Sequence, residues 1–155
     1  MKTYTTEEIL SHAIKFEELA YEFYQKIKGF VLDEVTKDTL EYLSREELGH
    51  KEFLKKYLAG QIKEGTLQFK DVHDAKILEA FSTPLVTENL AHKDVFLVAA
   101  KREQRSHEFY LKLSELHPAG PVRDLLVKLA YEELGHKEKV EYLYVNAAFP
   151  QTAGG

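Results

Sequence analysis

The sequence predicts an all-α fold, a bundle of four helices built from two similar antiparallel hairpins. Three observations support this prediction. Apolar residues recur at alternating spacings of three and four over four long stretches, which is the period of the buried face of a bundle helix. The heptapeptide Glu-Glu-Leu-Gly-His-Lys-Glu occurs twice, first from Glu46 and again from Glu132. The 4 prolines and 8 glycines fall mostly between the periodic stretches.

The first hairpin is expected to occupy residues 5–60. Thr5 and Glu8 have the spacing of a capping box, so a helix should begin beside them and end near Gly29. The connection over residues 30–33 allows only a tight turn, so the next helix, over 34–58, should run antiparallel, with Gly60 suited to its C-terminal end. The two buried seams are expected to be Leu10, Ala13, Glu17, Ala20, Tyr24 and Ile27, then Leu40, Leu43, Glu47, His50, Leu54 and Tyr57.

The second hairpin is expected to follow a long crossover. Residues 61–90 exceed what a hairpin turn needs, and they contain one short apolar helical piece over 77–81. The third helix should span roughly 92–116, and the fourth should run from Pro121 to about Asn146. We expect a single domain over 1–150 and a flexible tail over 151–155. The buried seams are expected to be Phe96, Ala99, Glu103, Ser106, Tyr110 and Leu113, then Leu126, Leu129, Glu133, His136, Val140 and Leu143.

The amino-acid composition argues against several classes of binding partner. Of 155 residues, 44% are hydrophobic and 30% are charged, and the formal net charge of −5 is distributed without a basic block. This argues against nucleic acid and anionic membranes as partners. No apolar run approaches the ~18 residues of a membrane span, and the first residues lack the apolar core of a signal peptide, so we expect a cytoplasmic protein. The chain has no cysteine, which excludes disulfides and thiolate metal sites.

The repeated heptapeptide places a glutamate and a histidine three residues apart in each copy. Residues at i and i+3 share one helix face, so each pair can offer a carboxylate and an imidazole to one metal ion. A preceding helix contributes one further glutamate in each half. All six candidate ligands lie in mid-helix and recur at a fixed offset of 86 residues: Glu17, Glu47 and His50, then Glu103, Glu133 and His136.

Four carboxylates and two imidazoles in a bundle interior are unfavourable without a counter-charge. Two divalent cations would neutralise the glutamates. Ligand sets of one glutamate from each of two helices and Glu-x-x-His from the other two are known to bind two metal ions. In that pattern Glu17 and Glu103 each bind one ion at the end of the pair, Glu47 and Glu133 bridge the ions, and each histidine binds one ion. Oxygen and imidazole donors suit iron or manganese, and zinc can replace them.

Glu46 and Glu132, the first residues of the two copies, precede the histidines by one turn. Each is placed where it could accept a hydrogen bond from a ligand imidazole and so fix its tautomer. The alternative is that both are solvated flanking residues. Tyr24 and Tyr110 are expected to be core residues, with a redox role as the alternative. Of the remaining histidines, His107 is a weaker candidate for an approach to the metals, and the others are expected at the surface or in loops: His12, His73, His92 and His117.

Over about residues 6–146, the four helices and six candidate ligands resemble the ferritin-like superfamily, and specifically its rubrerythrin-like branch. The resemblance implies a non-haem di-iron centre that reacts with peroxide or dioxygen. Full rubrerythrins add a cysteine-rich rubredoxin module. This chain lacks cysteine, so a separate electron-donor protein is expected. Rubrerythrins also carry an extra carboxylate at the position of Ser106, so the ligand set here is closer to the six-ligand pattern of bacterioferritins.

Three functions are compatible with the sequence. The first is a di-iron oxidoreductase, expected as a homodimer, that reduces peroxide or dioxygen. The second is an iron-binding protein with ferroxidase activity, which would need a shell of many subunits for storage. The third is a metal-free structural bundle, which would leave six polar residues on faces that the periodicity predicts to be buried.

Overall fold

The structure is a computed structural model, and it describes residues 3–60, 73–74 and 93–148. Within these residues lie four long helices, α1 (Thr6–Lys28), α2 (Glu34–Leu58), α4 (Asp94–Glu115) and α5 (Pro121–Ala148). A short ladder pairs β1 (Thr3–Tyr4) antiparallel with β2 (His73–Asp74). The helical piece expected over 77–81, the expected helix start at His92 and the expected tail over 151–155 lie outside the described residues.

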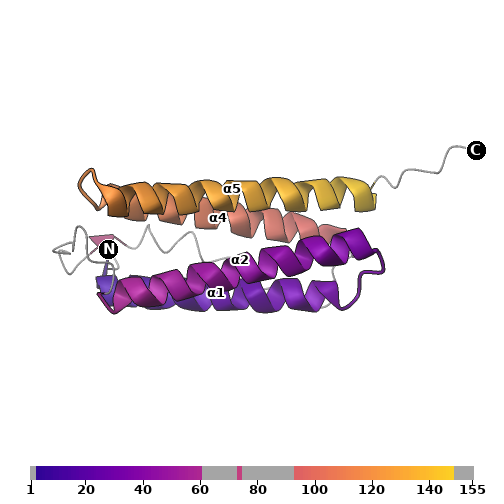
Figure 1. Cartoon of the computed structure of the whole chain (residues 1–155), viewed down its shortest axis with the longest axis horizontal. Coiled ribbons are helices and arrows are strands. Elements are labelled where there is room, and N and C mark those ends of the chain that lie inside the picture. Colours follow the sequence, from indigo (N-terminus) through magenta and orange to yellow (C-terminus); the bar gives the residue numbers. More distant parts are fainter. Residues whose placement is uncertain (1–2, 61–72, 75–92, 149–155) are drawn as a thin grey trace, which may run out of the picture.

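The helices form two antiparallel hairpins, α1–α2 and α4–α5, that lie lengthwise against each other (Figure 1). α2 ends at the end of the bundle where α5 begins, whereas α4 begins at the opposite end. The end of α2 and the start of α4 therefore lie at opposite ends of the bundle. The predicted arrangement, an all-α bundle of two hairpins joined by a long crossover, is confirmed.

Local chemistry explains where the helices of the first hairpin begin and end. Thr5 and Glu8 form the predicted capping box, because Thr5 Oγ1 accepts from the Glu8 amide at 3.1 Å and Glu8 Oε2 accepts from the Thr5 amide at 2.7 Å. Asp33 caps α2 by accepting from the Thr36 amide at 2.8 Å. Gly60 follows α2 with φ of 71°, a left-handed conformation that glycine adopts without strain.

The helices of the second hairpin differ slightly from their predicted bounds. α4 begins at Asp94, and its preceding residue Lys93 makes no side-chain capping bond. α5 begins at Pro121 as predicted and extends to Ala148, beyond the expected end at Asn146. Helix ends without a strong cap are the least determined by local sequence.

The apolar core is divided into two clusters at opposite ends of the bundle. Each cluster draws residues from all four helices. The first includes Leu10, Leu54, Leu113 and Leu126. The second includes Ile27, Leu40, Phe96 and Val140. In every helix the sequence between these two sets contains the polar seam residues. The polar layer therefore lies between two apolar layers, in the middle of the bundle.

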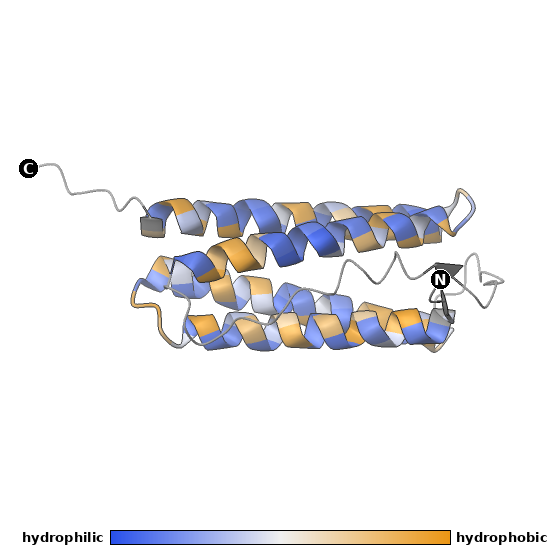
Figure 2. Ribbon diagram, turned by 180° about the vertical axis from the view of Figure 1, so that it is seen from behind, coloured by the Kyte–Doolittle hydropathy of each residue, from blue (hydrophilic) through white to orange (hydrophobic). Residues whose placement is uncertain are grey.

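Each helix of the bundle is mixed in polarity. Hydrophilic and hydrophobic residues alternate along the full length of every helix, as the amphipathic pattern requires (Figure 2). None of the helices in the described part of the chain has a stretch long and apolar enough to cross a membrane.

Candidate metal centre

The middle layer brings together all six side chains that the repeat singled out. They come from all four helices, and each is at most 4% exposed. Carboxylates and imidazoles are rarely buried to this extent unless they are paired or bind a metal. The six side chains are Glu17 of α1, Glu47 and His50 of α2, Glu103 of α4, and Glu133 and His136 of α5.

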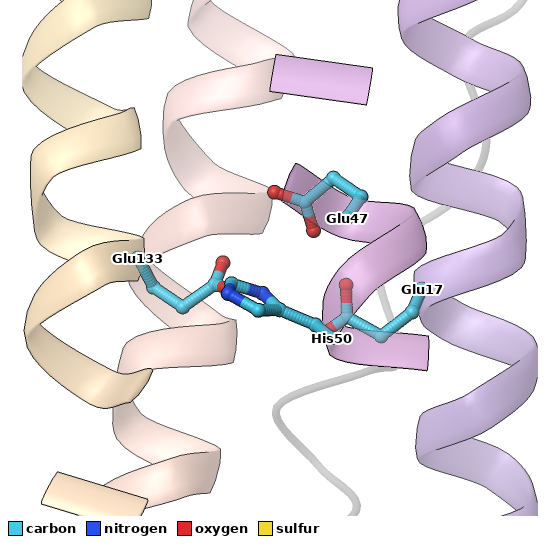
Figure 3. Close-up of side chains that lie close together, drawn as sticks. All are labelled: Glu17, Glu47, His50 and Glu133. Atoms are coloured by element: carbon cyan, nitrogen blue, oxygen red, sulfur yellow. The ribbon is translucent and has the colours of Figure 1, made fainter. Parts of the chain in front are cut away.

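Two overlapping groups of four exist within this layer. In each group, one ligand atom from every residue lies within 4.8 Å of the others. Figure 3 shows the first group, in which side chains from α1, α2 and α5 point toward one another between the helices. Glu47 and Glu133 belong to both groups. The groups are Glu17, Glu47, His50 and Glu133, and Glu47, Glu103, Glu133 and His136.

Each imidazole faces the glutamate of the opposite Glu-x-x-His helix. His136 Nδ1 lies 2.7 Å from Glu47 Oε1, and His50 Nδ1 makes the corresponding close approach to Glu133 Oε1. The two rings stack with centroids 5.6 Å apart and an interplanar angle of 16°. The Nδ1 atoms of both rings therefore point into the carboxylate layer, and the Nε2 atoms point away from it.

The outward-facing nitrogens meet two partly exposed carboxylates. Glu132 Oε2 accepts from His50 Nε2 at 3.1 Å, across the gap between α5 and α2. Glu46 Oε2 lies 3.9 Å from His136 Nε2, beyond hydrogen-bond distance. A carboxylate that accepts from Nε2 fixes the proton there, so Nδ1 of a neutral His50 ring has its lone pair directed at the layer.

Two tyrosines bind the remaining glutamates across the hairpins. Tyr110 of α4 donates to Glu17 Oε1 of α1 at 2.9 Å, and Tyr24 of α1 donates to Glu103 Oε1 of α4. Both tyrosines are buried, as expected for core residues, but sequence reasoning missed their bonds to the glutamates. The sequence did contain a signal for these bonds, because each tyrosine follows its half's first candidate glutamate by two helical turns and the two tyrosines are related by the same offset of 86 residues.

Several buried atoms of the layer lack hydrogen-bond partners within the described residues. A buried polar atom without a partner typically costs about 1–3 kcal/mol, so an accumulation of them in one layer requires an explanation. These atoms lie on residues of the two groups, and metal ions held between the carboxylates would coordinate them. The residues present therefore fit a pair of metal ions. The atoms are Glu17 Oε2, Glu103 Oε2 and Glu133 Oε2, together with Glu133 Oε1 and His50 Nδ1, which approach each other closely but without the geometry of a hydrogen bond.

The carboxylates cannot all ionise without a counter-charge. Burial, followed by repulsion from neighbouring carboxylates, raises the pKa of Glu17, Glu47 and Glu133 well above the ordinary range. Burial would also raise the pKa of Glu103, but the nearby Glu133 and His136 outweigh it and lower that pKa to about 2. Without metal, the layer therefore keeps protons at neutral pH.

The histidines of the layer are cationic without metal. Burial alone would lower the pKa of His50, but the bond to Glu132 and the charges of Glu17 and Glu47 raise it to about 9. The pKa of His136 is raised too, because Glu103 outweighs the effect of burial. A metal ion would have to displace these protons, as metal sites generally require.

The other candidates take no part in the two groups. Ser106 is buried in the seam of α4 and supplies no carboxylate. His107 is also buried, and its Nδ1 donates to the Ala130 carbonyl at 2.6 Å. His12 is exposed. His117 lies in the connection between α4 and α5, in agreement with the loop alternative, but its side chain is buried and bonds the hydroxyl of Tyr57. The side chains of His73 and His92 lie outside the described residues.

The fold is that of a ferritin-like four-helix bundle, and two solved structures match it over nearly the whole chain. A hypothetical protein from Pyrococcus furiosus matches 94% of this chain and 92% of its own length at 26% identity, with a TM-score of 0.72. A Thermotoga maritima protein, proposed to be a ferritin-like diiron-carboxylate protein, matches 95% of this chain and 99% of its own at 21% identity, with a TM-score of 0.70. No protein-family model and no curated protein matches the chain.

Proposed function

We propose that the chain is a non-haem di-iron carboxylate protein, of the rubrerythrin-like kind, that reduces peroxide or dioxygen. One observation supports this most strongly. Two buried groups, each of three carboxylates and one imidazole, share Glu47 and Glu133 and contain polar atoms without hydrogen-bond partners. The Thermotoga protein with the same fold, itself proposed to be a diiron-carboxylate protein, is consistent with this reading.

In this proposal each residue has a defined role. Glu17 with His50 would hold one ion and Glu103 with His136 would hold the other, and Glu47 and Glu133, which belong to both groups, would contribute to both ions. When bound, a pair of ferrous ions supplies the two electrons that reduce the oxidant. Manganese or zinc fits the same oxygen and nitrogen donors.

The surrounding side chains position the ligands and restrict access. Tyr24 and Tyr110 hold Glu103 and Glu17 by hydrogen bonds across the hairpins. Glu132 keeps the His50 proton on Nε2 and leaves Nδ1 for the metal. Because every ligand is buried, only small molecules such as peroxide or dioxygen are expected to reach the centre.

The proposal extends to the protein's partners. A chain without cysteine needs an external reductant, so we propose a separate electron-donor protein. We propose that it acts as a homodimer in the cytoplasm, and its net charge of −5 without a basic block argues against nucleic acid and anionic membranes as partners.

Iron oxidation for sequestration is the second candidate, and Ser106 favours it. The carboxylate that rubrerythrins carry at this position is absent, which leaves the six-ligand pattern of bacterioferritins. Storage requires a shell of many subunits. The mass of the native assembly therefore separates the two candidates, because a dimer supports the oxidoreductase and a shell supports sequestration.

The direct test compares peroxide consumption by the iron-loaded, reduced protein with that of a Glu47→Ala, Glu133→Ala double variant. We expect the natural chain to consume peroxide with oxidation of its iron, and the double variant to lose both bound iron and activity. Glu52→Ala, Glu138→Ala is the matched control, because these exposed glutamates occupy equivalent positions on the same two helices. Equal iron binding by both double variants would contradict the assigned bridging ligands.

A further inference from the structure

A further set of metal-ligating side chains lies on the outer side of the two imidazoles. It consists of Glu46 and His50 of α2 and Glu132 of α5, and one ligand atom from each lies within 4.8 Å of the others. The side chains of Glu46 and Glu132 are 37% and 34% exposed, whereas that of His50 is 4% exposed. This outer group therefore lies between the solvent and the buried layer.

The two carboxylates of the outer group occupy equivalent positions of the repeated heptapeptide. The offset of 86 residues relates Glu46 to Glu132, just as it relates the two histidines. Each carboxylate faces the histidine of the opposite helix. Glu132 Oε2 lies 3.1 Å from His50 Nε2, and Glu46 Oε2 lies 3.9 Å from His136 Nε2. Each copy of the heptapeptide thus places one partly exposed carboxylate in front of the imidazole of the other copy.

Hydrogen bonding does not explain the position of Glu46. At 3.9 Å its carboxylate is too far away to accept from His136 Nε2, and neither of these groups has another hydrogen-bond partner within the described residues. His136 is 3% exposed, and a buried ring nitrogen normally has a partner. A carboxylate that only fixes a tautomer would lie at bonding distance, as Glu132 does. A cation held in front of the imidazoles gives Glu46 a role that fits its position.

The outer group is open to solvent beside the glycines that precede the histidines. A Cβ added at Gly49 or Gly135 would have nothing within 4 Å. Gly135 also lines a surface cavity of about 320 Å³, together with Thr39 of α2 and Tyr142 of α5. An ion from solution can therefore reach the two outer carboxylates, whereas the six ligands behind them are at most 4% exposed.

We propose that Glu46 and Glu132 form an outer cation site, at which a divalent metal ion binds before it enters the buried centre. The inference rests on the proposed di-metal centre, because it names the step by which that centre is loaded. The donors are one oxygen of each carboxylate and, while the ion displaces the proton, Nε2 of His50. This mixed set suits the same metals as the inner positions. The outer site has fewer carboxylates and is screened by solvent, so its ion is transient, and the tightly bound ions remain two per chain.

A site on the loading route changes rates and leaves the final affinity unchanged. An ion passes the site in both directions, so its removal slows metal binding and metal release by the same factor. The two carboxylates also attract a dication from solution, and this attraction weakens as the ionic strength rises. A residue that only positions a ligand changes the affinity instead.

The test measures the rates of cobalt(II) binding and release in Glu46→Gln, which breaks no hydrogen bond of the described residues. We expect both rates to fall about tenfold, because one charge close to a dication in screened water is lost, while the dissociation constant stays unchanged. Glu52→Gln is the matched control, because it removes the same charge from an exposed position of the same helix, and it should leave both rates unchanged. Equal rates in the two variants would overturn the proposal.

Two further measurements separate loading from positioning. Glu46→Asp keeps the charge, so its rates should lie closer to those of the natural chain than to those of Glu46→Gln. A higher ionic strength should reduce the difference between the natural chain and Glu46→Gln. A lower affinity of Glu46→Gln without an equal change in both rates would overturn the proposal. A natural chain that binds no cobalt would contradict the di-metal centre itself, which is a different outcome from unchanged rates.

Discussion

At the scale of single residues, the contacts that orient the imidazoles differ between the two halves. His50 donates to Glu132 at 3.1 Å, whereas His136 lies 3.9 Å from Glu46. The carboxylate that accepts from a ligand histidine fixes its tautomer and increases its basicity, and its removal typically costs 10–100-fold in metal affinity.

Glu132→Gln is therefore expected to weaken metal binding by roughly 10–100-fold, because the amide is a poorer acceptor for His50 Nε2. Glu46→Gln should have a much smaller effect, since no hydrogen bond is lost. Cobalt titration of both variants measures the difference. Equal losses in the two variants would show that the negative charge between α2 and α5, and not the hydrogen bond to His50, controls the affinity for metal.

The residues of the candidate site were predictable to different degrees. The six members of the two groups share a face, a mid-helix position and a fixed offset, so their convergence follows from helical geometry. The bonds of Tyr24 and Tyr110 and the burial of His117 were not predictable. Their partners lie on other helices or across the other hairpin, and the period of one helix contains no information about which side chain of another helix lies opposite.

At the scale of the elements, short capping motifs in the sequence determine where most of the helices begin. The Thr5–Glu8 capping box and the Asp33 cap are satisfied within three residues, so the sequence alone determines where α1 and α2 begin. The start of α4 has no side-chain cap, so no local motif marks it in the sequence. The direction of α4 followed from the length of the connection and not from any local motif.

The helix-interior glycines Gly49 and Gly135 need no close approach of another helix. A Cβ added at either position would have nothing within 4 Å. Gly49→Ala and Gly135→Ala are thus each expected to raise the free energy of unfolding by roughly 1 kcal/mol, through the higher helix propensity of alanine. Urea unfolding of the metal-free variants measures this. A loss of stability or of metal binding in these variants would indicate that the metal centre requires glycine at these positions.

At the scale of the whole molecule, the buried charges link stability to pH. The folded-state pKa of His50, about 9 against an ordinary 6.5, means that its imidazolium stabilises the fold below pH 6.5 and that this contribution is lost as pH rises through 9. The raised pKa values of Glu17, Glu47 and Glu133 act in the same direction, because the unfolded chain ionises these groups near pH 4.5 while the folded chain retains their protons.

The metal-free protein is therefore expected to lose stability between pH 6.5 and 9, with His50 contributing up to about 3 kcal/mol. Metal-loaded protein should lose less, because bound cations replace the protons. Urea unfolding at several pH values, with and without a chelator, tests this. Metal-free stability that stays constant or rises with pH would contradict the assigned protonation of the layer.

The most direct test of the central claim is the number of ferrous ions bound per chain in an anaerobic titration of the metal-free protein. The account predicts two ions per chain, with proton release on binding. A protein that contains no metal when purified and takes up no ferrous iron would contradict it, and would leave the bundle as a structural scaffold.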